Sequence, residues 1–202
     1  QVIFTEAQLK EIFDPTRYID TFCRSRAGGP WTGRFWVPII RAFTGARSEE
    51  IAQLKKRHLI EVKDPHGRKK FWCFAIIEGQ DEHVKNIASQ RILVLPQRLI
   101  DMKILTYLEG KNFSGDMNLW GLEKTSGDGY DRSITRNWPK YIEKLNKELD
   151  SGISIPYYNL RHTFLSVAQT NLSRDEFLVA NTYTGHTDEG ISESTAAYLA
   201  EN

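Results

Sequence analysis

Four side chains in this sequence have the chemistry needed to cleave a phosphodiester without a metal ion. They are two arginines, a histidine and a late tyrosine, in the order Arg47, Arg161, His186 and Tyr198. Two arginines can clamp a phosphate from two sides, because each guanidinium binds two oxygens at once and stays charged at any working pH. The tyrosine can attack the phosphorus, and the histidine can donate a hydrogen bond or carry a proton. The set therefore predicts cleavage through a phosphotyrosine.

Each of these side chains also has a plainer interpretation. Arg47 could cap a helix or form a surface ion pair, and Tyr198 could pack on an Ala-rich terminal helix. His186 follows Gly185 at a helix boundary, where capping is the ordinary role. Four separate coincidences would then be needed, whereas one reaction explains all four residues, so we favour the reaction.

Two residues beside the arginines are expected to support them. Glu50 lies three residues after Arg47 on the same predicted helix, where it can brace the guanidinium. His162 follows Arg161 on an amphipathic helix and is expected to be a structural histidine. The departing 5′-oxygen also needs a proton, and a lysine on a loop is a suitable donor.

The elements that must position these side chains are mostly helical. The motif Thr5-Glu6-Ala7-Gln8 is a capping box that opens the first helix. Further helices are expected at 35–43, 48–54 (capped by Ser48), 97–108, 132–149, 158–170, 175–183 and 193–200. Two period-two runs, 58–62 and 71–77, flank the turn Asp64-Pro65-His66-Gly67 and predict a hairpin, and 91–95 predicts a third strand. The pattern predicts an α+β fold, mostly helical, with a small antiparallel sheet.

Length and composition set wider limits. The 202 residues are sufficient for one substantial core. No apolar run approaches membrane-spanning length and no signal peptide is evident, so a cytoplasmic location is expected. Cys23 and Cys73 have no metal-ligand spacing, which predicts two reduced, buried thiols.

The charge of the chain leaves nucleic-acid binding open. A net charge of +1 lacks the overall basicity that is usual for such proteins. A run of basic residues is usually a solvent-exposed face, and this explanation is sufficient for the local clusters Lys55-Lys56-Arg57 and Arg68-Lys69-Lys70. Composition alone therefore decides neither for nor against DNA.

The motifs that carry the candidate residues resemble those of a known family. Thr44-Gly45-Ala46-Arg47-Ser48-Glu49-Glu50 resembles the first arginine box of tyrosine recombinases (phage integrases), commonly T-G-x-R-x-x-E. Tyr158-Asn159-Leu160-Arg161-His162-Thr163-Phe164 resembles the second box, H-x-L-R-H-T-F. Gly185-His186 is similar to the L-G-H element, and Tyr198 stands where the nucleophile is expected. The resemblance spans nearly the whole chain.

This resemblance implies the fold and activity of a tyrosine-recombinase catalytic domain over residues 1–202, with a three-stranded antiparallel sheet. The implied reaction is site-specific strand cleavage and rejoining through a 3′-phosphotyrosyl bond, with no cofactor and no metal. The implied partners are double-stranded DNA attachment sites and other protomers in a tetrameric complex on DNA. A type IB topoisomerase and a degenerate recombinase that only binds DNA are the alternatives.

The family's lysine lies in the turn between the second and third strands. Lys85, in Lys85-Asn86-Ile87-Ala88-Ser89-Gln90-Arg91, matches that position. Lys69 and Lys70 are its rivals, although they fall in the first predicted hairpin. Lys85 is therefore the expected general acid.

Three departures from the family pattern matter. Tyr158 stands where the family has a histidine, and a phenol can donate a hydrogen bond but cannot carry positive charge. Residues 190–192 lengthen the gap between His186 and Tyr198. The family's upstream DNA-clamping domain does not precede these motifs here, so a fragment that is monomeric in isolation is expected.

Overall fold

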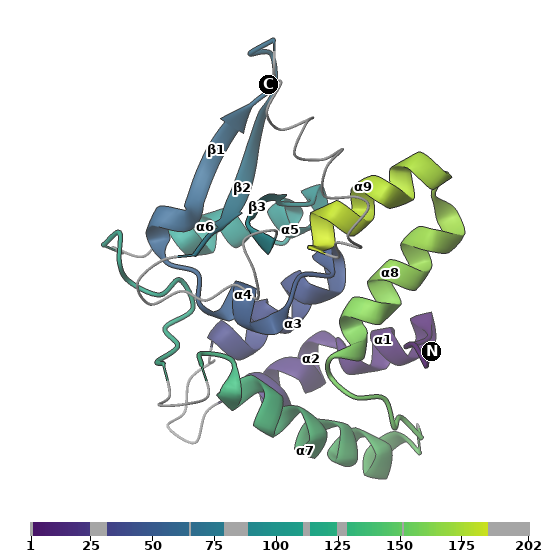
Figure 1. Cartoon of the computed structure of the whole chain (residues 1–202). Coiled ribbons are helices and arrows are strands. Elements are labelled where there is room, and N and C mark those ends of the chain that lie inside the picture. Colours follow the sequence, from purple (N-terminus) through teal and green to yellow (C-terminus); the bar gives the residue numbers. More distant parts are fainter. Residues whose placement is uncertain are drawn as a thin grey trace. The chain divides into compact units, whose positions relative to one another are not determined.

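The structure is a computed structural model that describes residues 2–24, 32–64, 66–78, 89–110, 114–124, 129–150 and 152–185. Contacts between Cα atoms divide the chain into two compact units (Figure 1). The first unit combines Gln1–Gln53 with Trp120–Ser166. The second combines Leu54–Leu119 with Val167–Asn202. Neither unit is one continuous stretch of sequence.

The described part of the first unit is helical. Its elements are α1 (Glu6–Ile12), α2 (Pro15–Arg17), the π-helix η1 (Tyr18–Cys23), α3 (Thr32–Thr44), α4 (Ser48–Ala52), α7 (Arg132–Leu149) and the first turns of α8 (Asn159–Asn171). The predicted capping box is confirmed, because the Thr5 hydroxyl accepts from the Gln8 N–H and the Gln8 side chain accepts from the Thr5 N–H. The helix predicted at 132–149 has the predicted bounds.

Aromatic packing and long-range hydrogen bonds hold this unit together. Phe22 packs edge-on against Trp138, with 5.4 Å between ring centroids, and Trp138 packs against Tyr157 at 4.9 Å. The N–H of Phe4 donates to the Thr163 hydroxyl at 3.0 Å. The start of the chain is thereby fixed to α8, the helix that carries Arg161.

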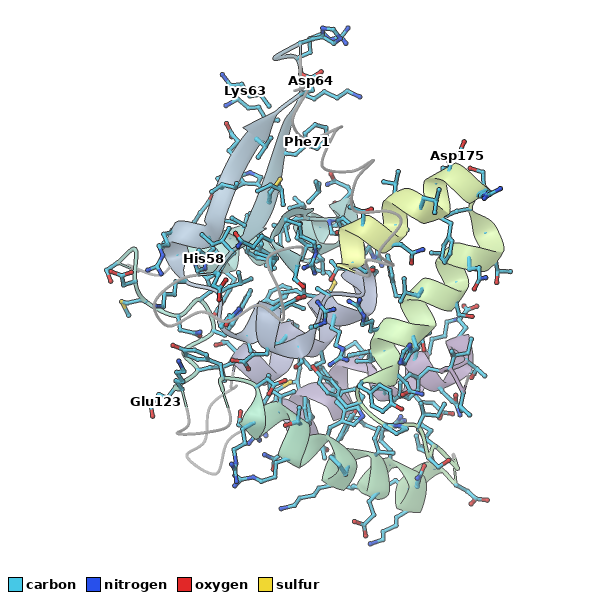
Figure 2. All side chains as sticks on the ribbon, in the orientation of Figure 1. His58, Lys63, Asp64, Phe71, Glu123 and Asp175 are labelled. Carbon is cyan, nitrogen blue, oxygen red and sulfur yellow. The ribbon has the colours of Figure 1, made fainter. Side chains whose placement is uncertain are left out.

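The second unit contains the sheet. Strands β1 (Leu59–Lys63), β2 (Lys70–Ile76) and β3 (Arg91–Val94) pair in that order, and both pairs are antiparallel. Phe74 pairs with Leu93 and both are fully buried, whereas Lys63 and Phe71 lie towards the exposed end of the hairpin (Figure 2). The other elements of this unit are the 3₁₀-helix η2 (Lys56–His58), α5 (Gln97–Asp101), α6 (Ile104–Glu109), the end of α8 and α9 (Arg174–Thr184).

The predicted fold class is confirmed: the chain is mostly helical, with a three-stranded antiparallel sheet. One of the predicted helix ranges is wrong. The helix expected from 97 to 108 is two helices, because Lys103 adopts a left-handed conformation (φ 65°) between α5 and α6. The first helix ends at Ile12, and the Asp14 carboxylate accepts from the N–H of Arg17 and caps the next helix, α2.

Further expectations concern cysteines and membranes. Cys23 and Cys73 are both buried and unbonded, as predicted, and burial raises the pKa of the Cys23 thiol to about 12. Among the residues that the structure describes, no helix is both long and apolar enough to span a bilayer. The helix expected at 193–200 lies outside the described residues.

Candidate active site

The segment between α3 and α4 carries the first predicted arginine. Gly45 has a positive φ of 65°, a conformation that glycine adopts without strain, and its N–H donates to the Arg41 carbonyl at 2.8 Å. The Thr44 hydroxyl donates to the Ile40 carbonyl at 2.7 Å. These contacts end α3 and turn the chain so that Arg47 stands at the start of α4.

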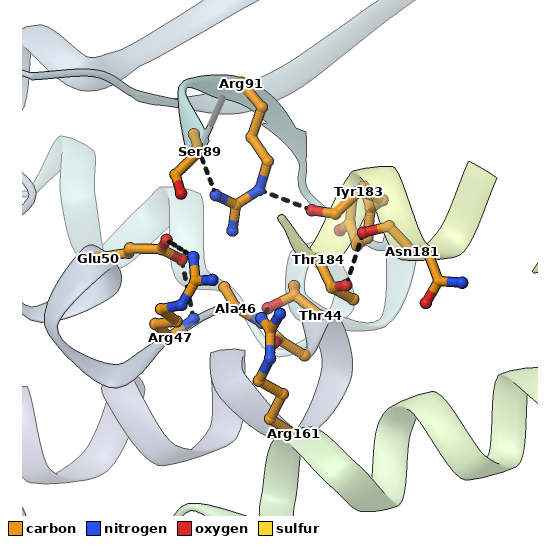
Figure 3. A network of polar contacts seen from close by, with 11 residues as sticks. Thr44, Ala46, Arg47, Glu50, Ser89, Arg91, Arg161, Asn181, Tyr183 and Thr184 are labelled. Carbon is orange, nitrogen blue, oxygen red and sulfur yellow. Dashed lines mark hydrogen bonds and ion pairs between the residues drawn. The ribbon is translucent and has the colours of Figure 1, made fainter. Parts of the chain in front are cut away.

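Glu50 holds Arg47 in two ways (Figure 3). One carboxylate oxygen of Glu50 lies 2.7 Å from Nη1 of Arg47, and the other accepts from the Arg47 N–H at 2.9 Å. The Glu50 side chain is 3% exposed, whereas that of Arg47 is 32% exposed. The prediction that Ser48 caps this helix is wrong, because Glu50 reaches back one residue further and places Arg47 at the cap position.

Arg161 reaches the same short segment from α8. It is 7% exposed, and its Nη1 donates to the Gly45 carbonyl at 2.6 Å. Gly45 is two residues before Arg47, so the first unit brings both predicted arginines to one turn of the chain. Two cations held this way favour the binding of an anion, because each guanidinium has five N–H donors and cannot be deprotonated in a protein.

Tyr158 and His162 lie one turn apart at the start of α8. Their rings meet edge-on with 5.4 Å between centroids, and Tyr158 is 56% exposed. Burial, followed by the positive charges of Arg161 and Arg41, lowers the pKa of His162. The imidazole is therefore neutral at neutral pH, which suits the structural role expected for it, while the exposed Tyr158 phenol can reach a bound group.

Arg41 is a residue that the sequence analysis missed. It is 5% exposed on α3, its Nη2 donates to the Tyr158 carbonyl at 3.0 Å, and its guanidinium carbon lies 4.6 Å from the Tyr157 ring centroid. It therefore fixes the backbone just before Arg161. A charged residue inside the otherwise apolar stretch 35–43 was the available signal.

The remaining predicted residues belong to the second unit. Lys85, His186 and Tyr198 lie outside the described residues and remain predictions. The rival Lys70 pairs with Glu61 at 2.7 Å on the hairpin.

Tyr183 is another tyrosine close to His186 in the sequence, and its environment argues against a role as the nucleophile. Its hydroxyl donates to the Val94 carbonyl at 2.6 Å. Burial raises its pKa, so the phenolate needed for attack is disfavoured.

No three His, Cys, Asp or Glu side chains gather closely enough to hold a metal ion within the ranges that the structure describes. Arg47 and Arg161 contribute guanidinium hydrogen-bond donors to this part of the first unit. Such donors can bind a phosphate or stabilise charge that develops on its oxygens.

Comparison with known proteins identifies the fold. No family model and no curated protein matches the sequence. A structure of the Tn1549 transposon integrase in complex with transposon right end DNA is similar, with a TM-score of 0.57 and 14% identity. The similarity covers 99% of this chain and 65% of that one.

A second structure of the same integrase, in complex with a circular intermediate DNA, gives a TM-score of 0.58 and 13% identity. The similarity covers 100% of this chain and 66% of the integrase chain, so this chain spans slightly less than two thirds of the integrase. The chain has the fold of a DNA integrase.

Proposed function

We propose that this chain is the catalytic domain of a tyrosine-type, site-specific DNA recombinase, an integrase that breaks and rejoins DNA strands without metal or nucleotide. The observation that carries the proposal is the pair of arginines. Arg47 is held by Glu50 and Arg161 by the Gly45 carbonyl, within a chain that has an integrase fold.

The proposed reaction is a transesterification. The hydroxyl oxygen of Tyr198 bonds to the phosphorus of one DNA strand while the bond from phosphorus to the 5′-oxygen breaks. The tyrosine loses its proton as it attacks, and the 5′-oxygen gains one, which leaves a 3′-phosphotyrosyl bond and a free 5′-hydroxyl. A partner strand's 5′-hydroxyl then attacks this bond and releases Tyr198. The number of phosphoester bonds is conserved, so no energy source is required.

The charged and polar residues have distinct roles in this proposal. Arg47 and Arg161 stabilise negative charge on the non-bridging oxygens. His186 donates a further hydrogen bond or carries a proton, and Lys85 protonates the 5′-oxygen. The exposed phenol of Tyr158 donates a hydrogen bond to the phosphate, in place of the histidine usual in the family.

Charge on the first unit supports duplex DNA as the partner. Arg132, Arg136, Lys140 and Lys144 are exposed and four residues apart on α7, so they share one face of the helix. This cationic stripe extends over about 18 Å. Burial, and to a smaller extent the positive charge of Arg136, lowers the pKa of Arg34. A surface of this kind binds phosphates although the net charge of the chain is only +1.

Strand exchange also requires partner protomers. Exchange of both strands of two duplexes needs four cleavage events, so we propose that four copies assemble on paired attachment sites. Assembly would be driven by DNA, and the isolated chain would remain monomeric.

Covalent trapping tests the proposal. The chain is incubated with a pool of nicked duplexes of randomised sequence, from which the 5′-hydroxyl fragment diffuses away after cleavage. An adduct that survives detergent is expected from the wild type and absent from Tyr198→Phe, with DNA binding retained. Tyr183→Phe is the matched control and should form the adduct. An adduct that persists in Tyr198→Phe would assign the nucleophile to another residue.

The same substrates separate the alternatives. Transfer of the trapped end to a different strand indicates a recombinase, whereas rejoining only to the original strand indicates a topoisomerase. The second candidate function is that of a degenerate recombinase that binds DNA without cleaving it. The observation that favours it is Tyr158, which stands where the family has a histidine. That protein would bind the pool without forming any adduct.

A further inference from the structure

The C-terminal end of α9 is held by a residue with no assigned role. The last carbonyls of a helix have no partner within the helix, and a cation there also interacts favourably with the helix dipole. Nε of Arg91 donates to the Tyr183 carbonyl at 2.8 Å, in the last turn of α9 (Figure 3). The Tyr183 hydroxyl in turn donates to the Val94 carbonyl, so β3 and the helix end contact each other twice.

The same guanidinium binds a second segment. Its Nη1 donates to the Ser89 carbonyl at 2.8 Å. Ser89 directly follows residues 79–88, which include Lys85. Arg91 therefore joins Ser89, four residues after Lys85 in the sequence, to Tyr183, three residues before His186.

Gly185, the residue before His186, fits this arrangement in two respects. It has a φ of 71°, a left-handed conformation that favours glycine. A Cβ atom at this position would lie 2.7 Å from Nη1 of Arg91 and 2.9 Å from its Cζ. The turn that leads into His186 is thus formed around the Arg91 side chain.

We infer that Arg91 is a positioning residue for strand cleavage, because it fixes Tyr183, shortly before His186, and Ser89, shortly after Lys85. The inference rests on the proposed function. It is distinct from simple stabilisation of α9, because one planar guanidinium bridges two carbonyls from segments that each carry a candidate catalytic group. An error of about 1 Å in the position of such groups can reduce a rate by about a hundredfold.

The test compares Arg91→Ala and Arg91→Lys with Arg98→Ala, an exposed arginine of the same unit. Rates of adduct formation are measured at saturating DNA, beside the DNA dissociation constant and the thermal midpoint. Arg91→Ala is expected to lose about a hundredfold in rate with unchanged DNA affinity. Arg91→Lys should recover only part of the rate, because lysine keeps the charge but lacks the fork.

A substrate with a 5′-bridging sulfur shows which group is displaced. A thiolate leaves without needing a proton, so a defect that acts through Lys85 should shrink on this substrate. A defect that acts through His186 should persist. An Arg91→Ala rate equal to that of Arg98→Ala at the same thermal midpoint would overturn the inference.

Histidine ring resonances provide a readout that needs no cleavage. The His186 signals are assigned by their loss in His186→Gln. They should move in Arg91→Ala and stay in place in Arg98→Ala. Unmoved His186 signals would overturn the inference even where adduct forms. Moved signals without any adduct from the wild type would uphold the placement of His186 by Arg91 and reject the proposed function.

Discussion

Arg47 and Arg161 are held by two different kinds of acceptor. Arg47 pairs with the buried carboxylate of Glu50, and Arg161 donates to the backbone carbonyl of Gly45. Both contacts restrict the guanidinium before a phosphate binds, so less side-chain entropy is lost on binding. Donors fixed in advance are most effective against charge that appears only in the transition state.

This geometry predicts that charge alone will not preserve activity. Arg161→Lys and Arg47→Lys should each lower the rate of adduct formation by about a hundredfold or more, almost as much as alanine. Lysine lacks the second donor arm in both cases. The rate is measured on the nicked duplexes, with Arg98→Lys as the control. Near-normal cleavage by Arg161→Lys would contradict the clamp.

His162 gives the chain a predicted sensitivity to acid. Burial and the charges of Arg161 and Arg41 lower its pKa in the folded chain, so the unfolded chain binds the proton more tightly. Well above the ordinary histidine pKa of about 6.5, His162 is neutral in both states and its titration does not change the free energy of unfolding. As the pH falls through that value, the unfolded chain takes up the proton first, so the free energy of unfolding decreases.

His162→Phe tests this effect because it keeps a ring against Tyr158 and removes the titration. Urea unfolding at about pH 7.5 and about pH 5.5 should show a smaller loss of stability in the variant than in the wild type. The carboxylates titrate in both proteins, so the difference between the two losses isolates His162. Equal losses would show that the lowered pKa has no effect on stability.

At the scale of elements, Glu49 connects α4 to the start of α7. Its carboxylate accepts from the N–H groups of Tyr130 and Asp131, each at 2.9 Å. Burial raises the pKa of Glu49, although these two hydrogen bonds oppose the shift. Gly129 allows the close approach, because a Cβ there would lie 2.6 Å from the carboxylate. The short helix that carries Arg47 is therefore anchored to a much longer one.

Removal of this anchor should destabilise the chain. Glu49→Ala leaves the two N–H groups of Tyr130 and Asp131 without their acceptor, at an expected cost of about 1–3 kcal/mol in the free energy of unfolding. Denaturant titration measures the change. Glu143→Ala removes an exposed carboxylate from α7 and should change stability little. The idea would be rejected if Glu49→Ala were no less stable than Glu143→Ala.

Elements with a strong local signal were predictable from the sequence. Helix α7 has regularly spaced apolar residues over 18 positions, and the hairpin has alternating strands around a turn motif. The π-helix at 18–23 and the break at Lys103 were not predictable. The π-helix makes a contact that a local pattern does not encode, because the Tyr18 hydroxyl donates to the Arg34 carbonyl at 2.6 Å.

The same distinction applies to the candidate site. The sequence identified Arg47, Glu50 and Arg161 as residue types, and the ion pair between the first two follows from their spacing. It did not identify the Gly45 carbonyl as the partner of Arg161, because these residues are 116 positions apart. Contacts between distant segments are set by packing of the whole unit, which local patterns do not encode.

At the scale of the whole molecule, charge is distributed unevenly. The net charge is +1, yet one face of α7 carries four exposed cations. Glu148 continues the same four-residue spacing and its carboxylate lies 3.6 Å from Nζ of Lys144, so the stripe is partly neutralised at that end. Local potential, more than net charge, decides where a polyanion binds.

DNA binding by the isolated chain should therefore be weak and strongly dependent on salt. Replacement of Arg132, Arg136, Lys140 and Lys144 by Gln should reduce the slope of log affinity against log salt by up to about 3–4. Fluorescence anisotropy at several salt concentrations measures the slope, and Lys10→Gln, an exposed residue of α1, is the control. An unchanged slope would exclude the stripe from the interface. A tetramer in DNA-free sedimentation would contradict the expected monomer.

The two-segment composition of the first unit has a consequence for protein synthesis. Phe4 and its partner Thr163 are 159 positions apart, and the Tyr141 hydroxyl donates to the carbonyl of Ile12. At about 5–20 residues per second, the ribosome needs on the order of 10–30 s to make the later partners. During that interval α1 and α3 have emerged while α7 and α8 have not. The apolar faces of α1 and α3 are then available to chaperones, and the core of the first unit cannot be completed until α8 has been translated.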